Sequence, residues 1–355
     1  MIQQVAPDFR TVTGHTEIIN KMFTSDSELS IQIKIKSNIK WTTSHNKDIS
    51  VIDQETDLSC FGIIRNAFQA CFDASTASAP GDRYRLVKEI GRGSFGKVCE
   101  IVRLSDKTTF ACKFQSKKKT LGMFGGNLAR AVKSVRSETE LGLKLSHPNV
   151  VKVYEVFETS SQILIIMERM YGGSLCSYAM RRDLICESHV ANIISQIVSA
   201  LKYIHSVGLV HRDVKLENIM LMSRLNPASK SIGIVKLIDF GCSRTLYDGS
   251  NAESFVGSGY FAAPEIFLRL GHNNKADMWS VGVVTFVCLS GKFPFRDISG
   301  PVGPYVRGLG TKPHVKPTDW IGISKNALDF TRKLLCFEPS KRMSAKEALN
   351  HTWLG

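Results

Sequence analysis

The sequence predicts an α+β protein in which a small β-rich lobe precedes a larger, mainly helical lobe. Three observations support this prediction. Short runs with strand composition cluster between residues 85 and 167, most of the chain after Ser174 has helical periodicity, and a polar, turn-forming stretch at 73–83 separates both from the first 72 residues. At 355 residues the chain exceeds the usual length of one compact domain, so we expect two lobes and an additional segment.

The first 72 residues contain two patterns of secondary structure but no chemical motif. Ser30–Lys36 alternates isoleucine with polar residues, as a half-buried strand does, and Phe61–Phe72 has the spacing of an amphipathic helix. We interpret residues 1–72 as an N-terminal extension of unknown role. It is either a regulatory or targeting appendage or a tail with transient structure, and no motif decides between these alternatives.

After the linker at 73–83, the predicted elements change from strands to helices. The expected strands are Arg85–Ile90, Val98–Arg103, Thr109–Phe114, Val151–Glu158 and Gln162–Met167, with a helix at about Ala129–Leu145 among them. The clearest helices beyond are His189–Ser206 and Asp277–Leu289. We therefore place a small lobe at about 84–167, a connecting hinge at 168–173 and a large lobe at 174–355.

A glycine-rich loop of the G-x-G-x-x-G type lies between the first two predicted strands. Glycines let a backbone approach phosphate groups closely and adopt positive φ, although this signal is weak alone. A dinucleotide-binding fold requires a helix directly after the loop, whereas a strand follows here and Lys113 lies on the next one. The residues expected to contact a nucleotide are Ile90, Gly91, Arg92, Gly93, Ser94, Phe95, Gly96, Lys97 and Val98.

Two acidic motifs lie in the predicted helical lobe. His211–Asn218 reads HRDVKLEN, and Lys236–Gly241 reads KLIDFG, an apolar strand that ends at a carboxylate. A carboxylate can accept a proton, and carboxylate and amide oxygens are ligands that Mg²⁺ prefers. Taken singly, Asp213 could be a structural loop residue and Asp239 a helix cap. Their occurrence together with a nucleotide loop and its lysine disfavours both alternatives.

Residues from about Tyr84 to Leu354 resemble a complete eukaryotic protein kinase domain, because these motifs occur in the family's order across some three-quarters of the chain. Lys215, two residues after the catalytic-loop aspartate, is typical of serine/threonine kinases. Val150–Glu158 and Ser290–Phe295 resemble the calcium/calmodulin-dependent protein kinase group. The resemblance implies a bilobal fold with a β-rich N-lobe that includes helix C and a mainly helical C-lobe. It also implies ATP and Mg²⁺ as cofactors and proteins bearing Ser or Thr as substrates.

The resemblance assigns roles to individual residues. Asp213 would accept the proton of the substrate hydroxyl, and Lys215 would neutralise charge on the transferred phosphoryl group. Asn218 and Asp239 would bind Mg²⁺. Lys113 would hold the α- and β-phosphates.

The acidic partner of the nucleotide lysine is expected in the helix before the His147-Pro148-Asn149 turn. Glu138 is favoured there, and Glu140 is the alternative. Met167 falls at the gatekeeper position, and the hinge that follows would hydrogen-bond adenine through its backbone. The residues expected around the adenine ring are Val98, Ala111, Met167, Glu168, Met170 and Met220.

Ser254 occupies the usual position of an activating phosphate, which an upstream kinase would add and Arg212 would receive. The alternatives are a constant charge from Glu253 or no switch at all. A preference for basic residues in the substrate remains undecided, because Ser174 replaces an acidic residue often found after the hinge glycines.

Four further residues have expected structural effects. Glu265 should pair with Arg342, and Asp277 should brace the catalytic loop. Gly142 stands where the family packs a large apolar side chain, so we expect a hole and a loosely held helix C. The rival functional interpretation is a nucleotide-binding pseudokinase scaffold, which the intact catalytic residues oppose.

Composition limits location and partners. The net charge is +14, and residues 1–83 carry eight basic against ten acidic residues, a net of −2, which leaves +16 for residues 84–355. Such a surface suits polyanions such as ATP, and nucleic acid is a weaker alternative because no basic low-complexity tract is present. Nine scattered cysteines without a CxxC pair favour the cytoplasm or the nucleus. No signal peptide or membrane span is expected, and the oligomeric state is not predicted.

Overall fold

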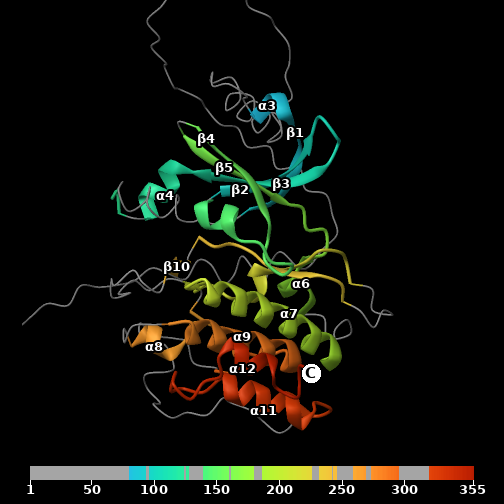
Figure 1. Cartoon of the computed structure of the whole chain (residues 1–355), viewed down its shortest axis with the longest axis vertical. Helices are drawn as coiled ribbons and strands as arrows, with labels where there is room; N and C mark the ends of the chain where they lie inside the picture. The colour runs from blue at the N-terminus through green and yellow to red at the C-terminus, as the bar shows by residue number, and fades with distance from the viewer. Residues whose placement is uncertain are drawn as a thin grey trace, which may run out of the picture. The chain divides into compact units, whose positions relative to one another are not determined.

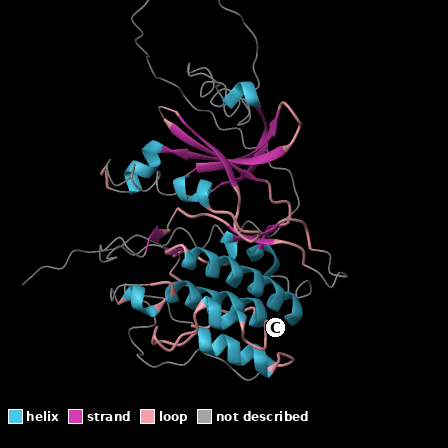
Figure 2. Cartoon of the chain, in the orientation of Figure 1, coloured by secondary structure: helices cyan, strands magenta, loops and turns pink. Residues whose placement is uncertain are grey.

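The computed structural model describes most of the chain from residue 80 onward. The described ranges are 80–92, 96–123, 125–127, 139–159, 161–179, 186–225, 232–241, 243–245, 259–268, 273–295 and 320–355. The predicted α+β architecture of two lobes is confirmed, with a sheet lobe followed by a mainly helical lobe (Figures 1 and 2). The strand expected at Ser30–Lys36 and the helix expected at Phe61–Phe72 lie outside the described residues.

A five-stranded antiparallel sheet forms the first lobe. Its strands are β1 (Tyr84–Arg92), β2 (Gly96–Arg103), β3 (Thr109–Ser116), β4 (Val153–Glu158) and β5 (Gln162–Glu168). Their order in the sheet is β1-β2-β3-β5-β4. The register places Val98 beside Lys113, and Ala111 beside Met167. Residues predicted from the sequence to contact the nucleotide are therefore neighbours across strands.

Strand β5, inside the sheet, is buried on both faces, which explains its near-continuous apolar sequence. Along β5, Leu164 and Ile166 belong to a cluster with residues of β2 and β3, whereas Ile163 and Ile165 pack with Val153 of β4. This alternation follows from the two-residue period of a strand. Each residue of the sheet is thus assigned to one face, which fixes the direction in which a functional side chain points.

Short helical segments accompany the sheet. Helix α3 (Pro80–Arg83) enters β1, within the stretch expected to be a linker. Helix α4 (Lys117–Met123) follows β3 and was not predicted. Residues 139–144 are helical, as expected for the end of the helix at Ala129–Leu145, and residues 128–138 lie outside the described part.

The second lobe is built around a central buried helix. Its helices are α6 (Leu175–Ala179), α7 (Glu187–Ser206), α8 (Pro264–Phe267), α9 (Lys275–Ser290), α11 (Lys325–Leu334) and α12 (Ala345–Leu349). Helix α9 is buried on all sides over most of its length and packs against α7 and α11 (Figure 1). The two long helices predicted from the sequence, α7 and α9, are confirmed to within two residues at their N-termini.

Very short strands carry the predicted catalytic segments. They are β6 (Gly173–Ser174), β7 (Leu209–Val210), β8 (Ile219–Leu221), β9 (Val235–Leu237) and β10 (Arg244–Thr245), and a 3-10 turn (Leu216–Asn218) precedes β8. Strands β6, β8 and β9 form one sheet, and β7 pairs with β10. The loop at 211–215 therefore begins at β7, and Asp239 follows two residues after β9.

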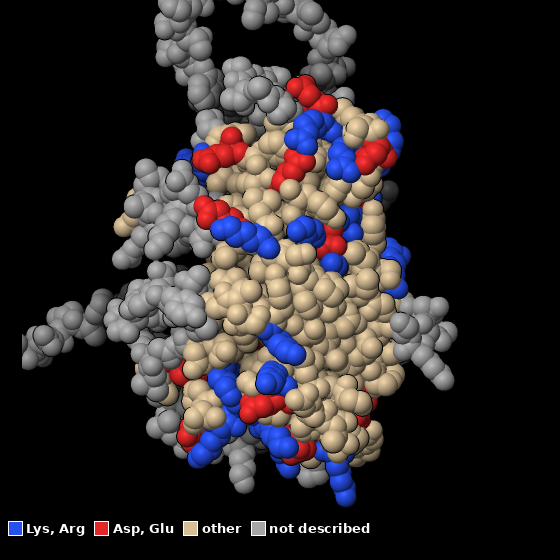
Figure 3. Space-filling view, in the orientation of Figure 1, with Lys and Arg blue, Asp and Glu red and all other residues tan. Residues whose placement is uncertain are grey.

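The surface and the helices also bear on possible partners. On the face that Figure 3 shows, lysines and arginines are interspersed with acidic residues. Among the residues described on that face, no continuous basic stripe for a polyanion is present. Among the described residues, no helix combines the length and the apolar composition that crossing a bilayer requires.

Candidate active site

The catalytic loop is anchored to the central helix by one buried carboxylate. Asp277 of α9 is completely buried and accepts hydrogen bonds from the amides of His211 at 2.9 Å and Arg212 at 2.8 Å. Its other close contact is Nε2 of His205 at 2.8 Å. Burial by itself raises the pKa of this carboxyl, but the hydrogen bonds from His205 and His211 hold its pKa below the ordinary value. Asp277 therefore stays charged, and it braces the loop as predicted.

This anchor holds an unusual backbone conformation. Arg212 has a φ of +65°, in the left-handed region that residues other than glycine rarely adopt. Such a conformation costs about 1–3 kcal/mol and persists only where the surroundings enforce it. The paired hydrogen bonds to Asp277 supply that enforcement, and they turn the following residue, Asp213, toward the centre of the site.

His211 connects the catalytic loop to the strand that leads to Asp239. Its ring is completely buried and packs edge-on against Phe240, with ring centres 5.0 Å apart. Burial lowers the pKa of this imidazole, although nearby carboxylates oppose the shift. A neutral ring protonated on Nε2 fits the contacts, because Nδ1 lies 3.3 Å from the amide of Asp213 and Nε2 lies 3.1 Å from the carbonyl of Ile238.

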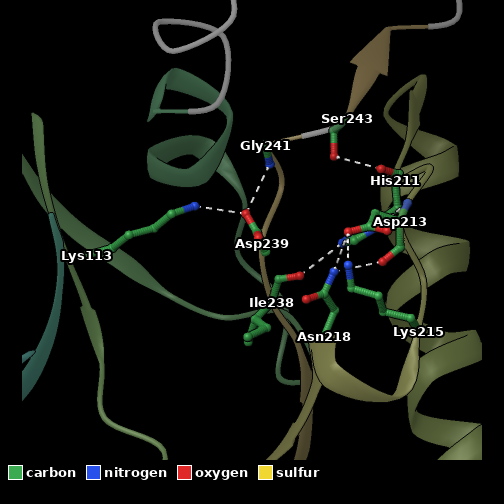
Figure 4. A network of polar contacts seen from close by, with 9 residues as sticks. All are labelled: Lys113, His211, Asp213, Lys215, Asn218, Ile238, Asp239, Gly241 and Ser243. Atoms are coloured by element: carbon green, nitrogen blue, oxygen red, sulfur yellow. Dashed lines mark hydrogen bonds and ion pairs between the residues drawn. The ribbon is translucent and has the colours of Figure 1, made fainter. Parts of the chain in front are cut away.

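Asp213 is oriented by two side chains of its own loop (Figure 4). Lys215 Nζ lies 2.7 Å from Asp213 Oδ2, and Asn218 Nδ2 donates to the same oxygen at 2.9 Å and to the Asp213 carbonyl at 2.8 Å. About a tenth of the Asp213 side chain is exposed. The amide hydrogens of Asn218 are thus directed at Asp213, while its side-chain oxygen points away from that residue.

Asp239 lies opposite Lys113, which is 126 residues earlier in the chain (Figure 4). Lys113 Nζ of β3 lies 2.9 Å from Asp239 Oδ1, and the Asp239 backbone has a φ of +65°. Burial raises the pKa of the Asp239 carboxyl, but the charge and hydrogen bond of Lys113, together with His211 and the amide of Gly241, hold the pKa below its ordinary value. Since 34% of the Asp239 side chain remains accessible, this carboxylate is charged and within reach of a ligand.

The contact between Lys113 and Asp239 was not predicted from the sequence, which pointed to Glu138 as the partner of the lysine. Glu138 lies outside the described residues. Glu140, the alternative, is on the exposed surface of the helical segment at 139–144. The only sequence signal for the observed pair was that both residues were expected near the phosphates of one nucleotide, Lys113 on the phosphates and Asp239 on their metal.

The two predicted metal ligands come from segments that are hydrogen-bonded to each other. The amide of Ile238, next to Asp239, donates to the carbonyl of Asn218 at 2.9 Å. Within the described ranges, no three His, Cys, Asp or Glu side chains gather in a way that would cage a metal. Mg²⁺ is commonly held by one or two protein oxygens together with phosphates and water. One carboxylate and one outward-facing amide oxygen therefore fit Mg²⁺ that a nucleotide shares.

The glycine-rich loop combines an open position with a packing requirement. A Cβ atom at Gly91 would meet nothing within 4 Å, whereas one at Gly96 would lie 1.7 Å from the carbonyl oxygen of Phe114. Gly96 is therefore needed for the close approach of β2 to β3. Ile90 and Arg92 lie with Gly91 on β1, Lys97 and Val98 lie with Gly96 on β2, and Gly93, Ser94 and Phe95 lie outside the described residues.

The hinge is fixed by a buried ion pair. The carboxylate of Glu168 lies 2.8 Å from Lys236 Nζ of β9 and accepts a hydrogen bond from the amide of Lys152 at 2.6 Å. Both side chains of the Glu168–Lys236 pair are about nine-tenths buried. Only the backbone of Glu168 was predicted to act, so this role of its side chain was missed. Lys236, three residues before Asp239, gave no sequence signal of a contact with Glu168.

The residues expected around adenine come from three parts of the fold. Val98 and Ala111 lie on β2 and β3, and Met220 lies on β8 of the other lobe. Ala111 and Met170 are buried, at 6% and 4% exposure. Met167, at the predicted gatekeeper position, is half-buried beside Ala111. The sheet, the hinge and β8 thus each contribute residues to the predicted nucleotide site.

Glu265 and Arg342 form the predicted lock beneath the site. The Arg342 nitrogens Nη1 and Nη2 lie 2.7 Å and 3.0 Å from the two carboxylate oxygens of Glu265. Both residues are buried, at 1% and 5% exposure. A bidentate pair of this kind is geometrically specific as well as strong. It fastens α8, the end of the segment that contains Ser254, to the base of the lobe, and Ser254 itself lies outside the described residues.

The expectation of a hole at Gly142 is wrong. A Cβ atom at this buried position would lie 2.8 Å from Cγ2 of Val153. Val153, the first residue of β4, therefore fills the space that the expected large side chain would occupy in the family that the sequence resembles. Since backbone and sheet approach each other directly, the glycine permits close packing rather than leaving a cavity.

Comparison with known proteins assigns the family. A family model described as the protein kinase domain matches residues 84–354. The match covers well over half of the chain, and the chain belongs to the protein kinase family. Members of this family use ATP with Mg²⁺.

Individual relatives place the chain close to the calcium/calmodulin-dependent group. It is 32% identical over 271 residues to myosin light chain kinase A of Dictyostelium discoideum, a match that covers 76% of this chain and 88% of that kinase. It is 32% identical over 282 residues to human calcium/calmodulin-dependent protein kinase type IV, covering 79% of this chain and 56% of that protein. It is 36% identical over 279 residues to CDPK-related kinase 4 of Arabidopsis thaliana, covering 77% of this chain and 44% of the relative.

These matches and the fold identify a serine/threonine protein kinase whose substrates are proteins. Nothing in the comparisons favours the pseudokinase alternative. The chain spans about half the length of the human and plant relatives, so what those proteins do as wholes does not transfer directly.

Proposed function

We propose that this chain transfers the γ-phosphoryl group of Mg·ATP to protein Ser and Thr hydroxyls with Asp213 as the catalytic base. The observation that carries the proposal is the orientation of the Asp213 carboxylate by Lys215 and Asn218. A carboxylate held this way can accept the hydroxyl proton while the hydroxyl oxygen attacks the γ-phosphorus. A new P–O bond forms to the substrate, and the bond to the bridging oxygen breaks with its electrons leaving on ADP.

The surrounding residues are proposed to stabilise the negative charge of the nucleotide phosphates and of the transferred phosphoryl group. Lys215 lies beside Asp213 and is placed to stabilise charge on the transferred phosphoryl group. Lys113 would bind the α- and β-phosphates once Asp239 turns to its metal. Bound Mg²⁺, held by Asp239 and Asn218, would neutralise phosphate charge. Two observations support these metal-binding roles. Asp239 has a left-handed backbone, and the amide nitrogen of Asn218 donates to Asp213, which leaves the amide oxygen for the metal.

The base is tested by Asp213→Asn, which keeps the size of the side chain and removes its basicity. We expect kcat for a generic Ser/Thr peptide to fall by about a hundredfold or more, because general-base catalysis contributes about 10²–10⁴-fold. Asp248→Asn, a change of the same type in the segment between Asp239 and Glu265, is the control. ATP turnover equal to that of the wild-type protein would refute the assignment.

We further propose that an upstream kinase phosphorylates Ser254 and that Arg212 receives the phosphate. The position of Ser254 in the sequence and the fixed backbone of Arg212 support this proposal. Protein purified from its native cell should lose most of its activity in Ser254→Ala and keep it in Ser250→Ala, four residues earlier. Full activity of Ser254→Ala would exclude the switch.

We infer an intracellular location, in the cytoplasm, the nucleus or both. The scattered cysteines support it, and the described ones are free thiols: Cys99, Cys112, Cys176, Cys186, Cys288 and Cys336. Fractionation of cells that express the tagged full chain is the measurement, and recovery mainly from the medium would contradict the inference.

A further inference from the structure

Arg169, the middle residue of the hinge, directs its side chain onto the sheet. Its Nε donates to Glu100 Oε2 at 2.9 Å, and its guanidinium carbon lies 4.7 Å from the centre of the Tyr171 ring. Only 16% of the Arg169 side chain and 14% of the Glu100 side chain are exposed. Arginine is rarely so enclosed unless it is paired, so the contacts with Glu100 and Tyr171 define one preferred position of the guanidinium.

The sheet register places this position beside the predicted adenine site. Glu100 pairs with Ala111 on β3, and Ala111 pairs with Met167 on β5. Glu100 is also two residues from Val98 on β2, so both side chains project from the same face of that strand. Through Glu100, Arg169 is therefore held at the face that Val98 and Ala111 present to the nucleotide.

The same guanidinium changes which hydrogen-bonding groups the hinge offers. Its Nη1 donates to the carbonyl oxygen of Met170. The amide of Met170 has no acceptor within the part of the chain that the structure describes. At this residue the amide donor is open, whereas the carbonyl oxygen already accepts one hydrogen bond from a cationic group, which uses one of its two lone pairs and places a second donor beside it.

We propose that Arg169 is a specificity-determining residue that selects against purines with a hydrogen-bond donor at C2. Adenine has the ring acceptor N1 between its C6 amine and its C2 hydrogen. With N1 at the Met170 amide and the amine toward Glu168, C2 faces the Met170 carbonyl. A C2 amine there would exchange its hydrogen bonds with water for a poor one, because the carbonyl already accepts from Arg169 and the cationic guanidinium lies beside the incoming donor. The inference rests on the proposed use of the hinge for ATP.

The chemistry requires arginine and not merely a positive charge. The planar guanidinium uses Nε for Glu100 and Nη1 for the Met170 carbonyl at the same time. A lysine ammonium has three donors on a flexible stem but lacks the planar fork that holds two acceptors in one fixed geometry. Arg169→Lys therefore keeps an ion pair with Glu100 available while weakening the hold on the carbonyl.

The test compares the binding of ADP and 2-amino-ADP, which differ only by the amine at C2, to the full chain with Mg²⁺ by titration calorimetry. In the wild-type protein, 2-amino-ADP should bind no better than ADP. In Arg169→Leu, the ratio of its Kd to that of ADP should fall about fivefold, the value of one ordinary hydrogen bond. Arg169→Lys should shift the ratio in the same direction and serves if the leucine variant is unstable.

Arg103→Leu is the matched control, because it removes another arginine–carboxylate contact of β2, with Asp106 at 2.6 Å. Its ratio should equal that of the wild-type protein. An unchanged ratio in both Arg169 variants, or an equal change in the control, overturns the proposal while nucleotide binding stands. Failure of the wild-type protein to bind either nucleotide would instead overturn the proposed nucleotide site itself.

Discussion

The two lobes hold their functional side chains by different means. In the helical lobe, Asp213 lies on a loop whose left-handed turn at Arg212 is enforced by the buried carboxylate of Asp277. In the sheet lobe, Lys113 lies on a regular strand between Val98 and Ile165 of the neighbouring strands. A loop position depends on a few polar anchors, whereas a strand position depends on the register of the whole sheet. A single substitution that removes a polar anchor of the loop should therefore lower stability more than the replacement of a functional side chain on a strand.

The largest expected effect is that of Asp277→Ala. The substitution removes the acceptor of two loop amides and leaves the His205 ring without its buried partner. Breaking a buried, charged network of this kind costs about 3–5 kcal/mol. We expect the free energy of unfolding in urea to fall by that amount and kinase activity to be lost.

Thr285→Val on the same helix is the control, since its buried hydroxyl donates only to the carbonyl of Val281, one turn earlier. Its unfolding free energy should change by about 1 kcal/mol. An Asp277→Ala protein as stable as this control would show that the loop is positioned by something other than Asp277.

Lys113→Met should separate activity from stability. The strand keeps its register, so we expect the melting temperature to change little, although the Asp239 carboxylate loses its partner. Loss of a cation that stabilises phosphate charge should lower kcat/KM by about 10²–10³-fold. Peptide phosphorylation and thermal denaturation measure the two quantities. If Lys113→Met lowered stability as much as Asp277→Ala does, the proposed difference between the two lobes would be wrong.

Gly142→Ala tests the packing between the helical segment and β4. Alanine is favoured over glycine in a helix by about 1 kcal/mol, but its Cβ would lie 2.8 Å from Val153 Cγ2. We expect overpacking to prevail and to lower the unfolding free energy by about 1–2 kcal/mol.

The double variant Gly142→Ala/Val153→Ala should recover part of the loss, measured as a coupling energy in a double-mutant cycle. A more stable Gly142→Ala protein would mean that the cavity expected from the sequence exists after all.

The smallest expected effect is a pH dependence from His211. Burial lowers the pKa of this imidazole, so between its ordinary value of about 6.5 and the lowered value the unfolded chain binds a proton that the folded chain does not. Stability should therefore fall as the pH is lowered through about 6.5, by at most about 1.4 kcal/mol per pH unit for this group.

Urea unfolding at several pH values measures this slope, and His211→Gln should reduce it. His147, whose pKa burial also lowers, contributes in the same direction and would remain in that variant. An equal slope in His211→Gln and in the wild-type protein would show that His211 does not titrate between the two states as expected.

The order of the elements and most candidate site residues were predictable because they depend on local patterns. The strands around the glycine-rich loop follow from apolar runs and turn residues, and the long helices α7 and α9 follow from helical periodicity. The loop from His211 to Asn218 carries base, lysine and amide within eight residues. Chain connectivity keeps these groups near one another, while their orientation depends on the anchor that Asp277 provides.

Longer-range contacts were decided by the tertiary structure. The pairs Lys113–Asp239 and Glu168–Lys236 join residues far apart in sequence, and Arg169 meets Glu100 only because the hinge folds back onto β2. Spacing could identify each partner as a charged residue but could not select among the many opposite charges available. The selection depends on which strands become neighbours.

The sequence by itself determined the kind of chemistry, because the motif residues supply a base, metal ligands and a cation that binds phosphate at the spacings of a kinase. Only the tertiary structure decided how these groups are held, and Gly142 illustrates the reason. Its effect depends on whether a neighbour can move into the vacated space, and Val153 does so from a strand eleven residues later. Packing is a property of surfaces that meet after folding, and no single segment of sequence encodes both of them.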